Sequence, residues 1–170
     1  MLVIGRGARM LMFYRDALKS VSFSWESALS LAMASQLAYV RSDSGIVQLA
    51  TETWGFVGCI PFSANSTQGF VAWDEDCVLV SYRGTESIGD WLLNASVAPT
   101  QRPYGRVHGG VSKGFGSVRT LVETALGQAG VAGKRLWLTG HSLGGGARGR
   151  QCRGVAEQLS GDRRLHLRSA

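Results

Sequence analysis

The pattern of apolar and polar positions predicts a helix near the amino terminus. Ser24 is suited to cap its first turn, and Glu26 places negative charge at the positive end of the helix dipole. Up to about Tyr39, apolar positions recur three and four residues apart, which indicates one buried face. That face comprises Ala28, Leu29, Met33 and Leu37. The polar run Ser-Asp-Ser-Gly at 42–45 then predicts a turn.

Apolar runs with strand character come next. Residues 54–62 form a mixed apolar segment with Pro61 near its end, and they predict an edge strand because proline cannot donate to a central ladder. Residues 69–73 and 77–82 are close enough to pair as an antiparallel hairpin. We expect the acidic residues 74–76 between them to form a solvated turn, because the alternating ligands of a calcium loop are missing. Val78, Leu79 and Val80 are apolar on both faces, as in a buried strand.

The second half of the chain repeats the alternation of strand and helix. A loop after Pro99 and Pro103 leads to residues 107–110, and the helix that follows ends near Gly127. Its predicted buried face comprises Phe115, Val118, Val122 and Ala125. The apolar run 136–138 then predicts a strand. The whole pattern indicates an α/β fold with a mostly parallel central sheet.

Length and composition fit one globular domain. The 170 residues are 45% apolar and 18% charged, as in soluble proteins. Because no stretch approaches the 18 or more apolar residues of a membrane-spanning helix, we expect no transmembrane segment. Arg6, Arg9 and Arg15 interrupt the first apolar runs, which is not the pattern of a signal peptide, so a cytoplasmic location is the default expectation. The sequence leaves the oligomeric state open.

The cysteines do not indicate a disulfide framework or a metal site. Cys59, Cys77 and Cys152 are odd in number and have no C-x-x-C or zinc-type spacing. We expect buried thiols. We also expect no cofactor, since no G-x-G-x-x-G fingerprint follows a predicted strand.

The net charge of +6 is concentrated at the carboxyl end. Residues 146–170 contain six arginines against Glu157 and Asp162, and so supply +4 of the total. The tail has no interleaved aromatic residues, and nucleic acid is therefore not the expected partner.

Candidate chemistry lies in the turn after the last predicted strand. Residues 140–144, Gly-His-Ser-Leu-Gly, fit the G-x-S-x-G pattern, in which a serine is exposed at a sharp strand-to-helix turn between small neighbours. We interpret Ser142 as a nucleophile. The backbone N–H of Leu143 is then free to donate to a tetrahedral oxyanion at a helix start. The alternative is a glycine-rich turn with an incidental serine.

A second candidate segment follows the strand 77–82. Thr85 is placed to donate toward a reacting carbonyl, and it also fits the cap of a following helix. Ile88, Trp91 and Leu92 give that short helix one apolar face, although Trp91 also fits a core aromatic. His108 is a base only if the fold brings it to Ser142, and a structural histidine otherwise.

Three motifs together resemble a known family. Residues 82–87 read Tyr-Arg-Gly-Thr-Glu-Ser with Asp90-Trp91 following, residues 107–110 read Val-His-Gly-Gly, and residues 138–145 read Leu-Thr-Gly-His-Ser-Leu-Gly-Gly. In this order and at these spacings they resemble the class 3 lipases, the fungal triacylglycerol lipase-like α/β hydrolases. The resemblance covers residues 25–145 and implies an α/β-hydrolase fold.

The resemblance also implies roles for the matched residues. Ser142 would be the acyl-accepting nucleophile, and the N–H of Leu143 with Thr85 would form the oxyanion hole. Residues 87–94 fall where the family keeps its lid, so Ile88, Trp91 and Leu92 would face lipid or the acyl site. Arg83, Gly84, His108 and His141 would shape the site. The implied reaction is hydrolysis of a lipid carboxylic ester through an acyl-enzyme, at a lipid–water interface.

The chain departs from the family pattern after Gly145. An α/β hydrolase needs an acid and then a histidine base after its nucleophile, and only Asp162 and His166 follow Ser142 here. Residues 146–154 contain three glycines and three arginines, a poor composition for a buried helix. We therefore expect an N-terminal segment at 1–24, a lipase-like core at 25–145 and an atypical arginine-rich tail at 146–170.

Two hypotheses follow from this departure. In the first, the reading frame slips after Gly145 or the sequence is truncated, so that the sheet is incomplete on its C-terminal side and the chain alone is a weak esterase. In the second, the chain is a non-catalytic interaction module derived from a lipase fold.

Overall fold

The computed structural model describes residues 12–20, 22–65, 67–84, 100–102, 105–107 and 109–140. Its helical elements are η1 (Arg15–Lys19), α1 (Trp25–Leu37), α2 (Asp43–Gln48), η2 (Leu49–Thr53) and α4 (Gly109–Ala129). Its strands are β1 (Gly58–Ala64), β2 (Thr67–Trp73), β3 (Cys77–Tyr82), β4 (Thr100–Arg102), β5 (Gly105–Val107) and β6 (Arg135–Gly140).

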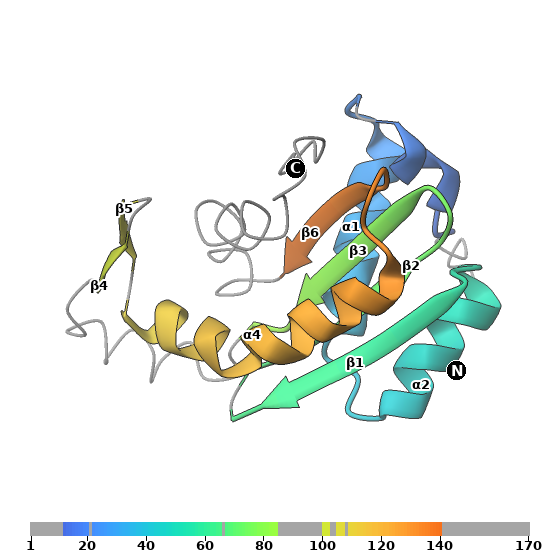
Figure 1. Cartoon of the computed structure of the whole chain (residues 1–170). Coiled ribbons are helices and arrows are strands. Elements are labelled where there is room, and N and C mark those ends of the chain that lie inside the picture. Colours follow the sequence, from blue (N-terminus) through green and yellow to red (C-terminus); the bar gives the residue numbers. More distant parts are fainter. Residues whose placement is uncertain are drawn as a thin grey trace, which may run out of the picture.

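The main sheet of the described residues has the order β1-β2-β3-β6 (Figure 1). The α/β class predicted from the sequence is confirmed. The expectation of a mostly parallel sheet is wrong for the described strands. β1, β2 and β3 are joined by short turns and therefore run antiparallel, whereas β6 pairs with β3 in parallel after the long crossover through α4.

Helices cover this sheet on opposite faces, with α4 on one and α1 on the other (Figure 1). The strands alternate between the two cores. In β3, for example, Leu79 faces the α1 side, whereas Val78 and Val80 face α4. All six residues of β3 are buried, which confirms the predicted buried strand.

The first predicted helix is confirmed in position and in its cap. The Ser24 hydroxyl accepts a hydrogen bond from the Ser27 N–H at 3.0 Å, and the Ser27 hydroxyl accepts one from the Ser24 N–H at 3.2 Å. The predicted buried face is only partly correct, because Ala28, Leu29 and Met33 are half-buried. The residues of α1 that are buried are Ser27, Ser30, Leu31, Ala34, Ser35 and Leu37.

The turn predicted at 42–45 is wrong. Ser42 instead caps α2, with its hydroxyl accepting the Gly45 N–H at 3.1 Å. Serine and aspartate bond to nearby backbone in turns and at helix starts alike, so the residue types alone do not separate the two. The predicted edge strand is confirmed as β1, which begins at Gly58 rather than at Trp54 and includes Pro61.

The hairpin of β2 and β3 is confirmed, but its turn is not fully solvated. Glu75 and Asp76 are exposed, whereas Asp74 is only 6% exposed. Oδ1 of Asp74 accepts the N–H groups of Asp76 and Cys77, each at 2.8 Å. Its Oδ2 lies 3.6 Å from Nε of Arg15 in η1 and accepts no hydrogen bond within the described part of the chain.

The loop predicted before the second long helix contains two short paired strands, β4 and β5. They lie at the amino-terminal end of α4 (Figure 1). In α4 the buried positions Val118, Val122 and Ala125 are as predicted, while the side chain of Phe115 lies outside the described residues.

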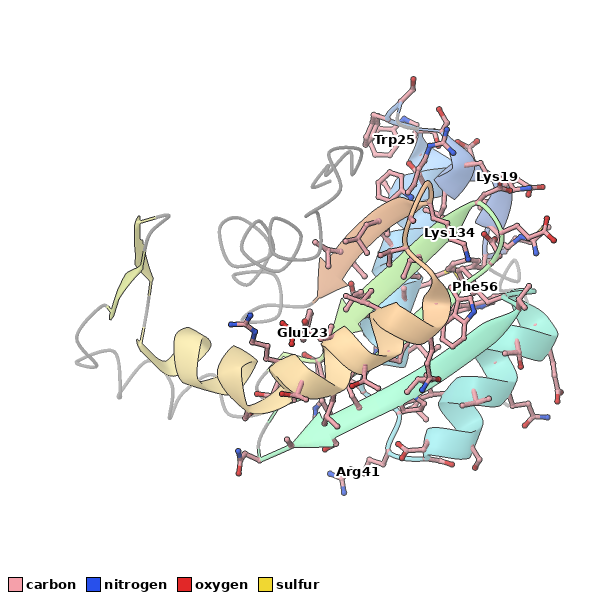
Figure 2. All side chains as sticks on the ribbon, viewed as in Figure 1. Lys19, Trp25, Arg41, Phe56, Glu123 and Lys134 are labelled. Atoms are coloured by element: carbon pink, nitrogen blue, oxygen red, sulfur yellow. The ribbon has the colours of Figure 1, made fainter. Side chains whose placement is uncertain are left out.

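The N-terminal segment packs onto the core from Phe13 onward. Leu18 is fully buried, and Phe13 stacks on Trp54 with ring centroids 4.1 Å apart. Lys19 pairs with Asp76 at 3.1 Å and so joins η1 to the hairpin turn. Trp25 is 80% exposed and projects at the same end of the molecule as Lys19 (Figure 2). Within the described residues, no helix has the length and apolar character needed to cross a membrane.

Candidate active site at the carboxyl ends of two parallel strands

The carboxyl ends of β3 and β6 lie side by side. The strands pair in parallel with Tyr82 opposite Gly140, so both chains leave the sheet at the same edge (Figure 1). Parallel α/β sheets bind their ligands at this edge, outside the carboxyl ends of the strands. Thr85 follows Tyr82 by three residues, and Ser142 follows Gly140 by two.

The predicted site residues themselves lie outside the described residues. These are Thr85, Ile88, Trp91, Leu92, Ser142 and Leu143, and His108 and His141 lie outside as well. The structure describes the ends of the strands that lead into the two segments, together with Arg83 and Gly84. The roles of the predicted site residues outside the described ranges therefore stay predictions.

Buried hydroxyl groups fix the end of β6 against α1. Oγ1 of Thr139 lies 2.7 Å from Oγ of Ser35 and 3.1 Å from the carbonyl oxygen of Leu31, and Oγ of Ser35 lies 2.9 Å from the same carbonyl. Thr139 is 1% exposed and Ser35 5%. The two hydroxyl groups carry two protons between them, so they donate two hydrogen bonds among these three short contacts.

The end of β3 is fixed to the same helix. Oγ of Ser81, a fully buried residue, donates to the carbonyl oxygen of Ala34 at 2.9 Å. Ser81 is also the register partner of Thr139. The helix α1 is therefore hydrogen-bonded to both parallel strands one residue before each strand ends.

The segment after β3 is held by Arg83 and the neighbouring strand. The Arg83 N–H donates to the carbonyl of Gln68 at 2.8 Å, and its Cζ lies 5.5 Å from the ring centroid of Tyr39. Nε2 of Gln68 in turn donates to the carbonyl of Ala38 at 3.1 Å. The family resemblance indicated that Arg83 shapes the site, whereas no sequence argument singled out Ser35, Ser81 or Thr139. The sequence signal that could have identified Ser81 and Thr139 is a hydroxyl residue directly after the apolar run of each strand.

Neither described thiol is suited to act as a nucleophile. Burial raises the pKa of Cys59 to about 12, and burial followed by the charge of Asp74 raises the pKa of Cys77 to about 12. Both are free cysteines; Cys77 is buried as predicted, whereas Cys59 is half-buried. Within the described residues, no group of three or more acidic, histidine or cysteine side chains is arranged to hold a metal ion.

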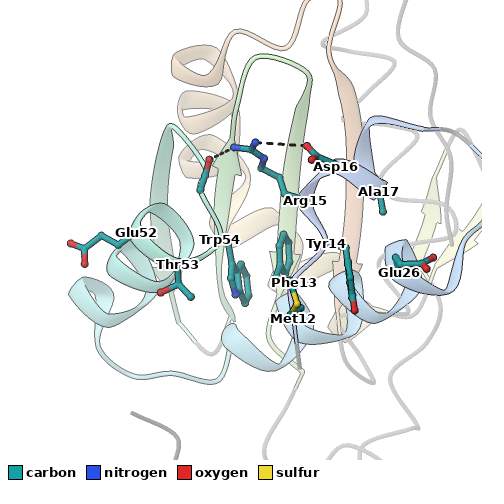
Figure 3. A pocket seen from close by; sticks show the side chains of 11 residues that line it. Met12, Phe13, Tyr14, Arg15, Asp16, Ala17, Glu26, Glu52, Thr53 and Trp54 are labelled. Carbon is teal, nitrogen blue, oxygen red and sulfur yellow. Dashed lines mark hydrogen bonds and ion pairs between the residues drawn. The ribbon is translucent and has the colours of Figure 1, made fainter. Parts of the chain in front are cut away.

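An open pocket of about 520 Å³ lies at the opposite end of the sheet (Figure 3). Phe13, Trp54 and Arg15 are among the residues that line it. Arg15 bonds to the carbonyl of Gly55 and pairs with Asp74 just before β3 begins. This location is away from the strand ends that lead to Ser142, so the pocket is not part of the candidate active site.

Comparison with known proteins agrees with this geometry. Residues 79–147 match the model of the family described as Lipase (class 3). The matched stretch is class 3 lipase-like. It begins within β3, includes α4 and β6, and covers the predicted positions Thr85, Ser142 and Leu143. Comparison with curated proteins returns no match.

Solved structures of fungal lipases have a similar fold. The triacylglyceride lipase of Rhizomucor miehei superposes with a TM-score of 0.58 at 21% sequence identity, covering 86% of this chain and 62% of the lipase. A second fungal lipase gives 0.57 at 21%, and a triacylglycerol lipase whose catalytic centre is a serine protease triad gives 0.57 at 20%, with the same coverage. The likeness supports an α/β-hydrolase fold, and the chain spans 62% of the length of these lipases.

The limit of the lipase-like stretch coincides with the change in composition. The match ends at Ala147, directly before the first arginine of the tail, Arg148.

Proposed function

We propose that this chain carries the nucleophile and the oxyanion-binding segment of a carboxylic ester hydrolase that acts on lipid esters. The observation that carries the proposal is the parallel pairing of Tyr82 with Gly140. Both strands end at the same edge of the sheet, and Thr85 and Ser142 follow these ends by three and two residues in the sequence. The class 3 lipase match over the same residues supports this interpretation.

In the proposed reaction, Oγ of Ser142 attacks the ester carbonyl carbon and its proton passes to a general base. The oxyanion that forms accepts hydrogen bonds from the N–H of Leu143 and from Thr85. The alcohol then leaves with a proton, and water attacks the acyl-enzyme to release the fatty acid. The family resemblance supplies these roles for the three residues.

The proposed substrate class is a lipid ester presented at a lipid–water interface. This rests on the family match and on Ile88, Trp91 and Leu92, which give the predicted lid segment an apolar face. The acyl chain of a lipid ester is apolar and needs cover from water while the ester reacts with Ser142. A lid segment with an apolar face fits such a substrate.

The reaction requires a general base, and all three histidines of the sequence lie outside the described residues. Loss of the base from a serine hydrolase lowers turnover by about 10⁶-fold, while the oxyanion hole and substrate binding retain a residual rate. We propose that ester hydrolysis by this chain depends on Ser142.

The test compares the purified chain with its Ser142→Ala variant. Hydrolysis of p-nitrophenyl butyrate and covalent labelling by a fluorophosphonate probe are measured on both. We expect hydrolysis and labelling by the chain, and neither above background for Ser142→Ala. Ser63→Ala, at an exposed strand position, is the matched control and should behave as the parent.

Equal rates for the parent and Ser142→Ala, with both shown by circular dichroism to be folded, would overturn the proposal. That result would instead favour the non-catalytic interaction module.

A further inference from the structure

The carboxyl ends of β3 and β6 carry two buried hydroxyl side chains, Ser81 and Thr139, and a third, that of Ser35, faces them from α1. Apolar side chains would fill the same space. Ser81 and Thr139 face the α1 side of the sheet, the side on which Leu79 and Trp137 are buried. A buried hydroxyl offers no stability over a methyl group of similar size unless its hydrogen bond is made. Here each hydroxyl is bonded to α1 or to its neighbour.

The bonds restrain one specific degree of freedom. Apolar contact between a helix and a sheet is not directional, so it tolerates small sliding of the helix along the strands. Hydrogen bonds from two register partners to carbonyls on successive turns of α1, those of Leu31 and Ala34, do not tolerate it. They fix the position of α1 relative to the strand ends.

We propose that Ser35, Ser81 and Thr139 form a positioning network for the ester-hydrolysing site. The inference rests on the proposed function. Thr139 precedes Ser142 by three residues, and Ser81 precedes Thr85 by four. The network fixes the end of β6, which precedes Ser142, relative to the end of β3, which precedes Thr85. None of the three residues touches the substrate in this role.

Positioning of this kind affects the rate of attack more than the stability of the fold. Misplacement of a reacting group by about 1 Å lowers a rate by up to about 10²-fold, since the reacting atoms must meet at near-attack geometry. The Thr139→Val substitution keeps the β-branched shape and removes the hydroxyl. The Leu31 carbonyl still has the Ser35 hydroxyl at 2.9 Å.

The experiment measures the second-order rate at which a fluorophosphonate probe phosphonylates the full chain. In this reaction a bond forms between Oγ of the serine and phosphorus, fluoride leaves, and the serine proton passes to solvent or to a base. Parent, Thr139→Val, Thr139→Ser and Thr51→Val are compared at a temperature at which thermal melts show each to be fully folded. Thr51 is the matched control, because its hydroxyl also bonds to a carbonyl, that of Val47 at 2.9 Å, but in η2.

We expect Thr139→Val to react about 10- to 100-fold more slowly than the parent. Thr139→Ser, which keeps the hydroxyl, should restore the rate to within about threefold, and Thr51→Val should match the parent. A Thr139→Val variant that is folded and reacts at the parental rate would overturn the positioning role, since a purely structural network lowers the melting temperature and leaves the rate of folded molecules unchanged.

Ser81→Ala provides a second measurement if Thr139→Val fails to fold. It removes one hydroxyl and adds no volume, and the Ala34 carbonyl keeps its bond from the Ala38 N–H at 3.3 Å. A slower rate for folded Ser81→Ala supports the proposal, and an unchanged rate overturns it. A folded parent that shows no Ser142-dependent labelling identifies a different failure: it overturns the proposed function, and the positioning role with it.

Discussion

The indole N–H of Trp137 donates to the carbonyl oxygen of Leu18 at 2.8 Å. Trp137 lies in the middle of β6 and Leu18 lies in η1, so this bond connects residues 119 positions apart in the sequence. Both residues belong to the same buried cluster on the α1 side of the sheet. The N-terminal segment is therefore part of the tertiary structure that supports β6.

Replacing Trp137 by Phe should lower the free energy of unfolding by about 1 to 2 kcal/mol, because the Leu18 carbonyl loses a buried partner. Urea unfolding followed by circular dichroism measures the change. Trp25→Phe is the matched control, since Trp25 is 80% exposed, and should change the value by less than about 0.5 kcal/mol. Equal effects of the two substitutions would contradict a stabilising role for the bond.

Replacing Ser24 by Ala should cost about 1 kcal/mol of stability, because the first turn of α1 loses the bond to the Ser27 N–H. Ser24→Gly should cost only a few tenths of a kcal/mol, since glycine is tolerated at helix caps. Thermal unfolding of both variants beside Ser22→Ala, at a nearby exposed position, checks this order. A Ser24→Ala protein as stable as the Ser22→Ala protein would argue against the cap.

Two glycine-to-alanine substitutions should have opposite signs. At Gly69 a Cβ would lie 2.0 Å from the carbonyl oxygen of Ser81 and 2.6 Å from Cζ of Phe62, so Gly69→Ala should destabilise the fold by about 3 kcal/mol. At Gly116 in α4 nothing lies within 4 Å, and Gly116→Ala should stabilise by about 0.5 to 1 kcal/mol because glycine is unfavourable inside a helix. Chemical unfolding of the two variants tests the difference, and the same sign for both would show the prediction to be wrong.

The raised pKa values of Cys59 and Cys77 predict a loss of stability at alkaline pH. In the unfolded chain a thiol ionises near pH 8.5, whereas burial holds both pKa values near 12 in the folded chain. Below about pH 8.5 the thiols are neutral in both states, so their ionisation does not change the free energy of unfolding. Between about pH 9 and 12 the unfolded state loses protons that the folded state retains, so stability falls as pH rises.

Unfolding free energies measured in urea at pH 7.5, 9 and 10 should decrease in that order. A Cys59→Ala/Cys77→Ala protein should lose less stability over the same range. Labelling at pH 8 with a thiol reagent, in a Cys152→Ser background, should modify neither cysteine until urea unfolds the chain. Rapid labelling of both thiols in the folded state would contradict their burial.

The elements predicted well from the sequence are those in which hydrophobic burial decides the structure. The strands β3 and β6 and the buried positions Val118 and Val122 of α4 follow directly from apolar spacing. Apolar residues can be predicted to be buried from local sequence alone, because removing their surface from water is favourable whatever their partners are.

The features that the sequence did not predict depend on hydroxyl groups. Ser30 and Ser35 are buried in α1, where Ser30 accepts the Tyr14 N–H at 2.8 Å and Ser35 contacts Thr139. A hydrophobicity pattern counts these serines as exposed. The face of α1 predicted from it is therefore rotated about the helix axis relative to the face that is buried. Whether a serine is buried depends on a partner distant in the chain, and local spacing holds no information on that partner.

Pro61 also bears on how copies of this chain meet. It lies in β1, the outer strand of the described sheet, opposite Phe70 of β2. Because the ladder to β2 continues on both sides of this pair, the nitrogen without a proton lies on the outward side of the strand. A second β-strand that approached this edge would find no donor at that point, and a continuous intermolecular ladder would be interrupted there. Pro61 thus interrupts the row of outward-facing donors along the outer strand of the described sheet.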